Sequence, residues 1–224
     1  MSAEPAAPTA ATTTAPPAPA AIPRTARWRW LFRALSAALA IKATAFAVSA
    51  LTLFRPPDGW IGKHSLAVPL LAWDSEHYRD VVVEGYPDAG PDGRIPLRIA
   101  FFPLYPLLVR AAAELMTVEA AMLLVSNLAS MAALVFVWLW ADELRGPRTA
   151  YRTCLIAVSY PAAMFLSAGY TEGPFLLCTA LVLWLLNRRA VGAAAVAAGI
   201  ASALRPTGVV LGAATQRYDA AAAT

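Results

Sequence analysis

The feature that most constrains this chain is its series of apolar blocks, the longest of which could cross a lipid bilayer as helices. Residues 34–54 and 119–141 are almost entirely apolar, and about 20 apolar helical residues span the roughly 30 Å of bilayer hydrocarbon. Shorter apolar blocks follow at 150–168, 174–187 and 190–204. Only 14% of the residues are charged, against about 25% in soluble domains. The sequence therefore predicts an all-α bundle of transmembrane helices and excludes an ordinary soluble enzyme.

Arginines mark one side of this predicted membrane protein. They precede the first apolar block and recur in the loop at 145–152 and at Arg188 and Arg189. Because basic loops stay on the cytoplasmic side of a membrane, we expect a cytoplasmic N-terminus. We also expect residues 1–23, which are rich in Ala, Pro and Thr, to form a disordered tail. The formal charge of +4 comes from these helix ends, so no nucleic-acid partner is expected.

A long polar region at 55–118 follows the first block and is expected on the outer face, where it would carry any chemistry. Within it, the apolar run at 99–109 is too short to span and contains two prolines, which favours a re-entrant or interfacial helix. The transmembrane module is expected to occupy 24–215. Residues 216–224 are expected to form the irregular end of a truncated chain.

The segment at 73–86 (WDSEHYRDVVVEGY) carries the first candidate residues. In a helix, Asp74 and Tyr78 would share an inward face with His77 at its edge. A carboxylate at the start of a helix can stay ionised and act as a general base, or it can cap the helix. His77 could bind phosphate, shuttle a proton or serve only as a structural hydrogen-bonding group.

Two later polar groups are expected on the same outer face. Tyr170 and Glu172 lie at the tip of a turn between two apolar blocks, which forms either a plain surface turn or part of a site. Arg205 ends an apolar block and can either reach the lipid headgroups or clamp a phosphate. Cys154 and Cys178 lie in apolar blocks and indicate core packing. With no metal-ligand spacing and no Gly-rich phosphate loop, neither a metal nor a cofactor is expected.

Four segments in order form a recognisable pattern. The first two are WDSEHY…EGY at 73–86 and AFFPLYPLL at 100–108, and the others are SYPAAMFLSAGYTE at 159–172 and ALRPTG at 203–208. The pattern resembles the PIG-V family of GPI mannosyltransferases, with W-D-x-x-H-[FY]…GY, F-F-P-x-[FY]-P-L, S-P-A…F…A-x-Y-[ST]-E and R-[ST]-N-G. The last segment departs from it, because Thr207 stands where the family has Asn. Chains of that family also continue with further spans.

This resemblance implies a GT-C glycosyltransferase, a polytopic enzyme that takes a sugar from a polyprenyl-phosphate donor and inverts its anomeric centre. It implies that Asp74 acts on the acceptor hydroxyl, and that Glu172 is a second acidic position in the substrate pocket. It also implies that Arg205 faces the donor phosphate, with His77 or Lys42 helping. Tyr78 and Tyr170 would complete the substrate-binding residues.

The implied partners are a mannose-bearing polyprenyl phosphate, a glycolipid or lipoglycan acceptor, and membrane lipid. The Arg-, Ala- and Pro-rich usage indicates a GC-rich bacterial genome, so the acceptor would belong to a bacterial envelope rather than to a GPI anchor. The enzyme would then lie in the plasma membrane with its site outside. Two rival interpretations are a transporter, which would suit Lys42 within the first span but lacks detectable internal repeats, and a non-catalytic fragment of a mannosyltransferase.

Overall fold

The protein is represented by a computed structural model that describes residues 24–51, 68–88 and 97–222. The predicted tail at 1–23 lies outside the described residues, as do outer-loop residues 52–67 and 89–96. The described ranges are helical and contain no strand, which confirms the all-α prediction.

Helices are long where the sequence is apolar and end where prolines, glycines or polar residues interrupt it. In chain order they are α1 (Arg24–Leu51), η1 (Val68–Leu71), α2 (Asp74–Glu84), η2 (Leu97–Ala100), α3 (Leu104–Ala113), α4 (Val118–Arg145), α5 (Pro147–Ser159), η3 (Pro161–Leu166), α6 (Glu172–Asn187), α7 (Val191–Leu204) and α8 (Gly208–Ala222). Two helices, α1 over Arg27–Ala47 and α4, are long and apolar enough to cross a membrane.

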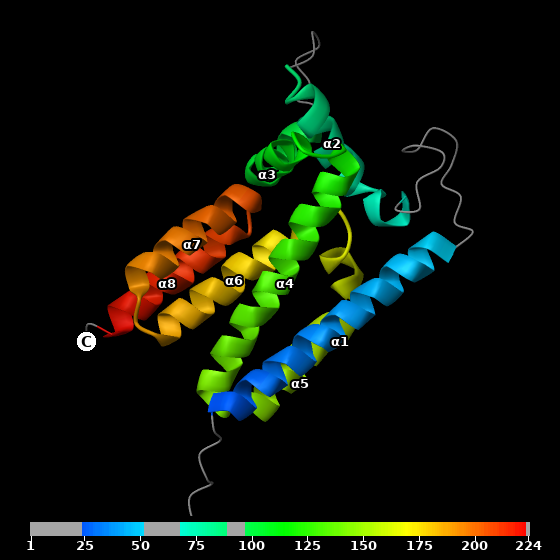
Figure 1. Ribbon diagram of the computed structural model, residues 1–224. Helices are drawn as coiled ribbons and strands as arrows, with labels where there is room; N and C mark the ends of the chain where they lie inside the picture. Colours follow the sequence, from blue (N-terminus) through cyan, green and yellow to red (C-terminus); the bar gives the residue numbers. More distant parts are fainter. Residues whose placement is uncertain (1–23, 52–67, 89–96, 223–224) are drawn as a thin grey trace, which may run out of the picture.

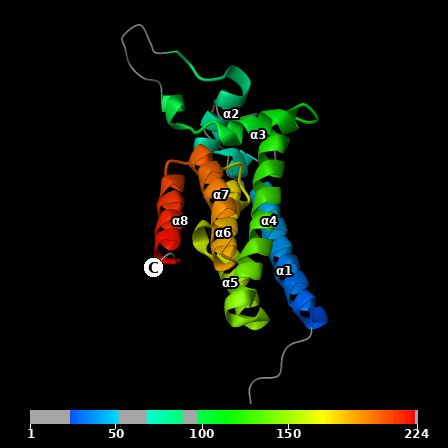
Figure 2. The ribbon, with the colours of Figure 1, turned by 90° about the vertical axis from the view of Figure 1, so that its left-hand side faces the viewer.

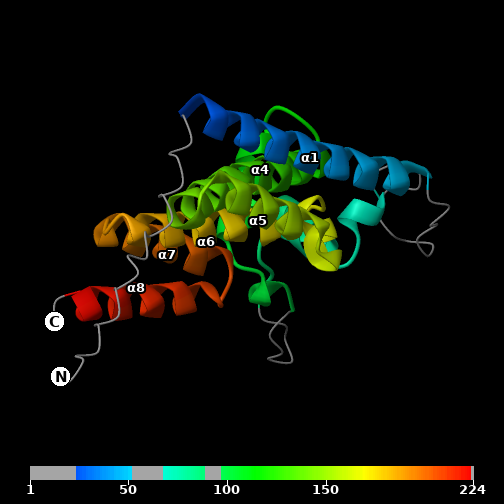
Figure 3. The ribbon, with the colours of Figure 1, turned by 90° about the horizontal axis from the view of Figure 1, so that it is seen from below.

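The helix α4 lies at the centre of the bundle. It packs against α1 and α5 on one side and against α6 on the other, and α7 and α8 follow beyond α6 (Figure 1). Figure 3 shows this succession from α1 to α8 from below. The short helices α2 and α3 lie across one end of the bundle, where α3 contacts both α4 and α7 (Figure 2).

Two expectations about helix bounds are wrong. The block at 150–168 is not one helix, because α5 ends at Ser159 and Pro161 starts the separate 3-10 helix η3; proline lacks the N–H that would continue the ladder. Residues 216–222 are not irregular, because α8 runs to Ala222. Its alanines have the highest helix propensity of any residue. By contrast, α3 has ten residues and lies across the bundle end, a geometry that suits the interfacial interpretation of 99–109.

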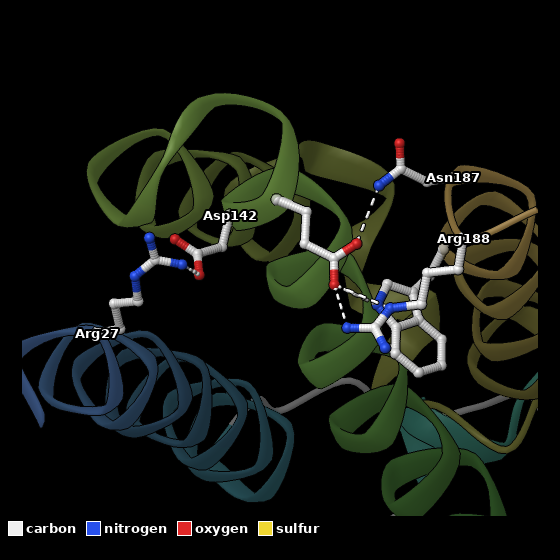
Figure 4. A network of polar contacts seen from close by, with 6 residues as sticks. Arg27, Asp142, Asn187 and Arg188 are labelled. Atoms are coloured by element: carbon white, nitrogen blue, oxygen red, sulfur yellow. Dashed lines mark hydrogen bonds and ion pairs between the residues drawn. The ribbon is translucent and has the colours of Figure 1, made fainter. Parts of the chain in front are cut away.

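The end of the bundle opposite α2 and α3 is basic and is tied together by α4 (Figure 4). Arg27 of α1 pairs with Asp142 at 3.2 Å. The neighbouring Glu143 carboxylate accepts hydrogen bonds from Arg188 at 2.6 Å and from Asn187 at 2.9 Å. Asp142 is buried, whereas the pair between Arg188 and Glu143 is more exposed, and exposed pairs contribute less than about 1 kcal/mol. The contacts of Glu143 nevertheless fix the end of α6 beside the end of α4.

Helix length then determines how deep the other end of α6 lies. With a rise of about 1.5 Å per residue, the 28 residues of α4 span about 42 Å and the 16 residues of α6 about 24 Å. The two helices are joined at their basic ends, so α6 starts well inside the bundle. Its second residue, Gly173, lies against the backbone of Ser126, about 12 Å along α4 from its first residue. The start of α6 is therefore recessed below α2 and α3.

Candidate active site

The loop that leads into α6, residues 166–171, is buried along its whole length. Irregular backbone inside a membrane protein needs hydrogen-bond partners from the surrounding helices. Ser126 of α4 donates to the Tyr170 carbonyl at 2.7 Å and accepts from the Tyr170 N–H at 3.2 Å. Ser75 of α2 donates to the Gly169 carbonyl at 2.9 Å. This segment, called the buried loop below, is thus held by side chains from both sides.

Lys42 of α1 completes the support of the buried loop. Its side chain is buried, and the ammonium group donates to the Leu166 carbonyl at 2.6 Å, to Asn127 Oδ1 at 3.0 Å and to Ser167 Oγ at 3.4 Å. An ammonium group has three N–H donors, and all three are engaged. The expectation that Lys42 faces a polar interior fits this geometry. The suggestion that Lys42 helps to bind the phosphate of the sugar donor does not fit, because all three of its N–H groups already bond within the protein.

The helix α2 presents Asp74 at the surface. The buried positions are Ser75, Tyr78, Val81 and Val82, so the expectation that Asp74 faces inward is wrong. Helical spacing alone would place Asp74 between Val81 and Tyr78, but Asp74 is the first residue of α2 and its side chain is exposed. Nor does Asp74 cap the helix, since the N-cap residue is Trp73 and no side-chain cap bond forms. Within the described residues the Asp74 carboxylate has no hydrogen-bond or ion-pair partner, which leaves it accessible.

Two tyrosines connect α2 to the buried loop. The Tyr170 hydroxyl donates to the Ala72 carbonyl at 2.8 Å, just before the start of α2, and the Tyr78 hydroxyl donates to Thr171 Oγ1 at 3.5 Å. Burial raises the pKa of Tyr170 to about 12 and raises the pKa of Tyr78 above its ordinary value. The negative charge of Asp74 acts in the same direction on both. Both hydroxyls are therefore neutral donors at physiological pH.

An ion pair joins the start of α6 to the end of α7. Arg205 Nη1 lies 2.7 Å from Glu172 Oε1, and the guanidinium also lies over the Phe175 ring, 5.8 Å from its centroid. The second carboxylate oxygen, Glu172 Oε2, is buried without a hydrogen-bond partner. The Arg205 side chain is 38% exposed, so part of its planar donor set remains accessible. Arg205 is thus paired with Glu172 and still has N–H groups that a ligand can reach.

The fold brings five of the six predicted site residues together. The Tyr78 hydroxyl contacts Thr171, which precedes Glu172 and its partner Arg205. The Tyr170 hydroxyl contacts Ala72, two residues before Asp74. The sixth, His77, packs its ring against Phe101 at a centroid distance of 5.0 Å. No contact joins His77 to Glu172 or Arg205 within the described residues.

The sequence interpretation missed the residues that support this site. Three polar side chains hold the buried loop in place: Ser75, Ser126 and Asn127. The sequence signal for Ser126 and Asn127 was their position as adjacent polar residues inside the apolar block at 119–141. A buried polar side chain in an apolar helix needs a partner, but the sequence alone does not say which one. Among the described residues, no three His, Cys, Asp or Glu side chains come together in a group able to hold a metal ion.

A bundle of apolar helices, two of them long enough to cross a bilayer, is typical of an integral membrane protein, and here an arginine and a carboxylate pair at the recessed start of α6. Residues 100–221, more than half of the chain, match the dolichyl-phosphate-mannose-protein mannosyltransferase family. The chain belongs to this family.

Two curated relatives carry the name GPI alpha-1,6-mannosyltransferase 2. The human protein is 27% identical over 168 residues, which cover 69% of this chain and 33% of that protein. The rat protein is 28% identical over 153 residues, covering 63% of this chain and 30% of that protein. The chain thus spans about a third of the length of these relatives, and no solved structure matches it. The relatives confirm the resemblance to the PIG-V family.

Proposed function

We propose that this chain catalyses transfer of mannose from a polyprenyl-phosphate donor to a membrane glycolipid or lipoglycan acceptor, with inversion at the anomeric carbon. The observation that carries the proposal is that Tyr78 and Tyr170 join the start of α2, which carries Asp74, to the ion pair of Glu172 and Arg205. Membership of a mannosyltransferase family supports the sugar and the reaction type.

The residues can be assigned roles in one displacement step. The Asp74 carboxylate takes the proton of the acceptor hydroxyl, whose oxygen forms a bond to the anomeric carbon of mannose. The bond from that carbon to the donor phosphate oxygen breaks, and its electron pair leaves with polyprenyl phosphate. Arg205 stabilises the departing phosphate through its accessible N–H groups, while Glu172 fixes the direction of the guanidinium.

The recessed position of the site suits a substrate anchored in lipid. The start of α6 lies about 12 Å along α4 from its first residue, close to where a headgroup phosphate meets the hydrocarbon. The neutral hydroxyls of Tyr78 and Tyr170 add polar character beside Asp74 without adding charge. His77 is assigned a contact at the margin of the substrate, beside Phe101.

The basic end of the bundle supports the proposed orientation. The start of α1, the join of α4 and α5 and the join of α6 and α7 all lie there (Figure 1), and all three carry arginines. With this end cytoplasmic, the site opens on the outer face of what we propose to be a bacterial plasma membrane. Sugar nucleotides do not reach that face, which favours a lipid-linked donor.

The test is transfer of labelled mannose from polyprenyl-phosphate mannose to membrane lipids. We expect membranes that carry the chain to transfer mannose and the Asp74→Asn form to lose at least about 100-fold in rate, since general-base catalysis contributes roughly 100- to 10,000-fold. Asp88→Asn, the same change at another exposed residue of the outer region, should retain normal transfer.

Near-normal turnover in Asp74→Asn would refute the assignment of the base. Absence of transfer by the unaltered chain, at an expression level verified in the membrane, would refute the proposal that this chain is an active transferase. Equal losses in Asp74→Asn and Asp88→Asn would attribute the effect to the loop as a whole rather than to one carboxylate.

A further inference from the structure

The residue before the proposed base has an unusual backbone conformation. Trp73 has φ 57° and ψ −122°, the angles of the first central residue of a type II′ turn. The turn is closed by the Ser75 N–H, which donates to the Ala72 carbonyl at 3.3 Å. Glycine dominates this position because it has no Cβ. A bulky side chain with positive φ is a genuine outlier.

Both ends of this turn are fixed by the buried loop. The Ala72 carbonyl also accepts the Tyr170 hydroxyl at 2.8 Å, and the Ser75 hydroxyl donates to the Gly169 carbonyl at 2.9 Å. The surroundings therefore impose the positive φ on whatever residue occupies position 73. Glycine would satisfy this backbone without strain, and the sequence has tryptophan instead.

Packing does not explain the tryptophan. The Trp73 side chain is 53% exposed, and within the described residues its indole makes no hydrogen bond or ring contact. Trp28, which is 52% exposed, instead stacks on Trp138 with centroids 6.3 Å apart. Strained backbone around an exposed, unpartnered side chain is typical of a functional position.

We propose that the Trp73 indole is a stacking platform for a pyranose ring beside Asp74. This inference rests on the proposed transferase function, and it adds a sugar-binding residue to that site. A hexopyranose ring presents C–H groups on one face, and the electron-rich face of an indole attracts them while burying apolar area. A ring held there lies next to the carboxylate of the adjacent residue. Either the donor mannose or a sugar of the acceptor meets this description.

A pair of substitutions separates this role from a structural one. Trp73→Gly removes the strain, so we expect the thermal stability of the full chain to stay equal or rise, while the KM for one substrate rises about tenfold. Trp73→Phe retains an aromatic face and should keep the KM within about threefold of normal. Trp28→Leu, which removes an equally exposed indole at the other end of the bundle, should leave both KM values unchanged.

The rival role is a tryptophan that anchors α2 in the membrane interface. An anchor would make Trp73→Gly less stable in the membrane and would leave both KM values unaltered. A fall in stability that parallels the loss of activity, or normal KM values for donor and acceptor in Trp73→Gly, overturns the proposal.

Binding measurements identify which sugar is stacked. The full chain, purified in detergent, is titrated with polyprenyl-phosphate mannose and with polyprenyl phosphate lacking the sugar. If the donor mannose stacks, the unaltered chain prefers the mannosylated lipid and Trp73→Gly loses that preference. If an acceptor sugar stacks, the preference persists and only the acceptor KM rises. Normal kinetics in Trp73→Gly beside an inactive Asp74→Asn refutes this inference alone. Failure of the unaltered chain to bind or use the donor refutes the proposed function as well.

Discussion

Substitution of Gly173 tests whether α6 starts as close to the backbone of α4 as the structure indicates. A Cβ at this position would overlap the Ser126 carbonyl oxygen and would lie 3.2 Å from Ser130 Cβ. Real Cβ contacts essentially never fall below 3.0 Å. The obstacle is backbone of α4, which cannot rotate aside, so Gly173→Ala must push α6 away from α4.

The magnitude follows from two opposing effects. Overpacking a filled interior costs about 1–3 kcal/mol, and a backbone obstacle places this case near about 3 kcal/mol. Alanine recovers up to about 1 kcal/mol over glycine through helix propensity, so we expect a net loss of about 2 kcal/mol in unfolding free energy. Gly199 of α7 is exposed with nothing within 4 Å of an added Cβ. Gly199→Ala should therefore gain up to about 1 kcal/mol.

The assay is reversible unfolding of the two purified variants in the same detergent. We expect Gly199→Ala to exceed Gly173→Ala in unfolding free energy by about 3 kcal/mol. Mannose transfer should fall in Gly173→Ala alone, because the displaced residue adjoins Glu172. A Gly173→Ala variant as stable as Gly199→Ala would show that α4 and α6 do not approach closely at this point. That result would refute the recessed position of the start of α6.

Two further predictions concern the buried loop. Because the folded state raises the pKa of Tyr170 to about 12, its contribution is present below pH 10 and is lost as pH rises from about 10 to 12, by at most about 3 kcal/mol. Thermal unfolding across this range should show a smaller loss in Tyr170→Phe, and an unchanged pH dependence would contradict the buried hydroxyl. Lys42→Met strands acceptors at Asn127 and Ser167 and should lower the unfolding free energy by about 2–4 kcal/mol; a variant of normal stability would exclude these hydrogen bonds.

The helical class and most helix positions could be predicted because they follow from apolar length and from proline. The block at 119–141 appears as α4, and the shorter blocks at 174–187 and 190–204 appear as α6 and α7. The predicted helix bounds were wrong where a local sequence signal was overlooked. Pro161 ends the helical stretch after Ser159, and the alanines after Arg217 extend α8 to Ala222.

The candidate residues could be listed from the sequence, but their environment could not. Helical spacing placed Tyr78 correctly on the buried face of α2, whereas Asp74 was assigned to that face and is exposed at the start of the helix. The contact between Glu172 and Arg205 joins residues 33 positions apart, and no local pattern indicates such a pair. Lys42 shows the same limit, since its partner is a backbone carbonyl more than a hundred residues away.

Exposure separates the residues of this site into two groups with different consequences. Ser75, Ser126 and Lys42 are buried, and each holds the backbone of the buried loop. Removing any of them strands a polar group in an apolar interior, so stability and activity should fall together. Asp74 and Trp73 are exposed and without partners within the described residues. Since the fold does not depend on their side chains, changes there can remove chemistry or sugar binding and leave the bundle intact.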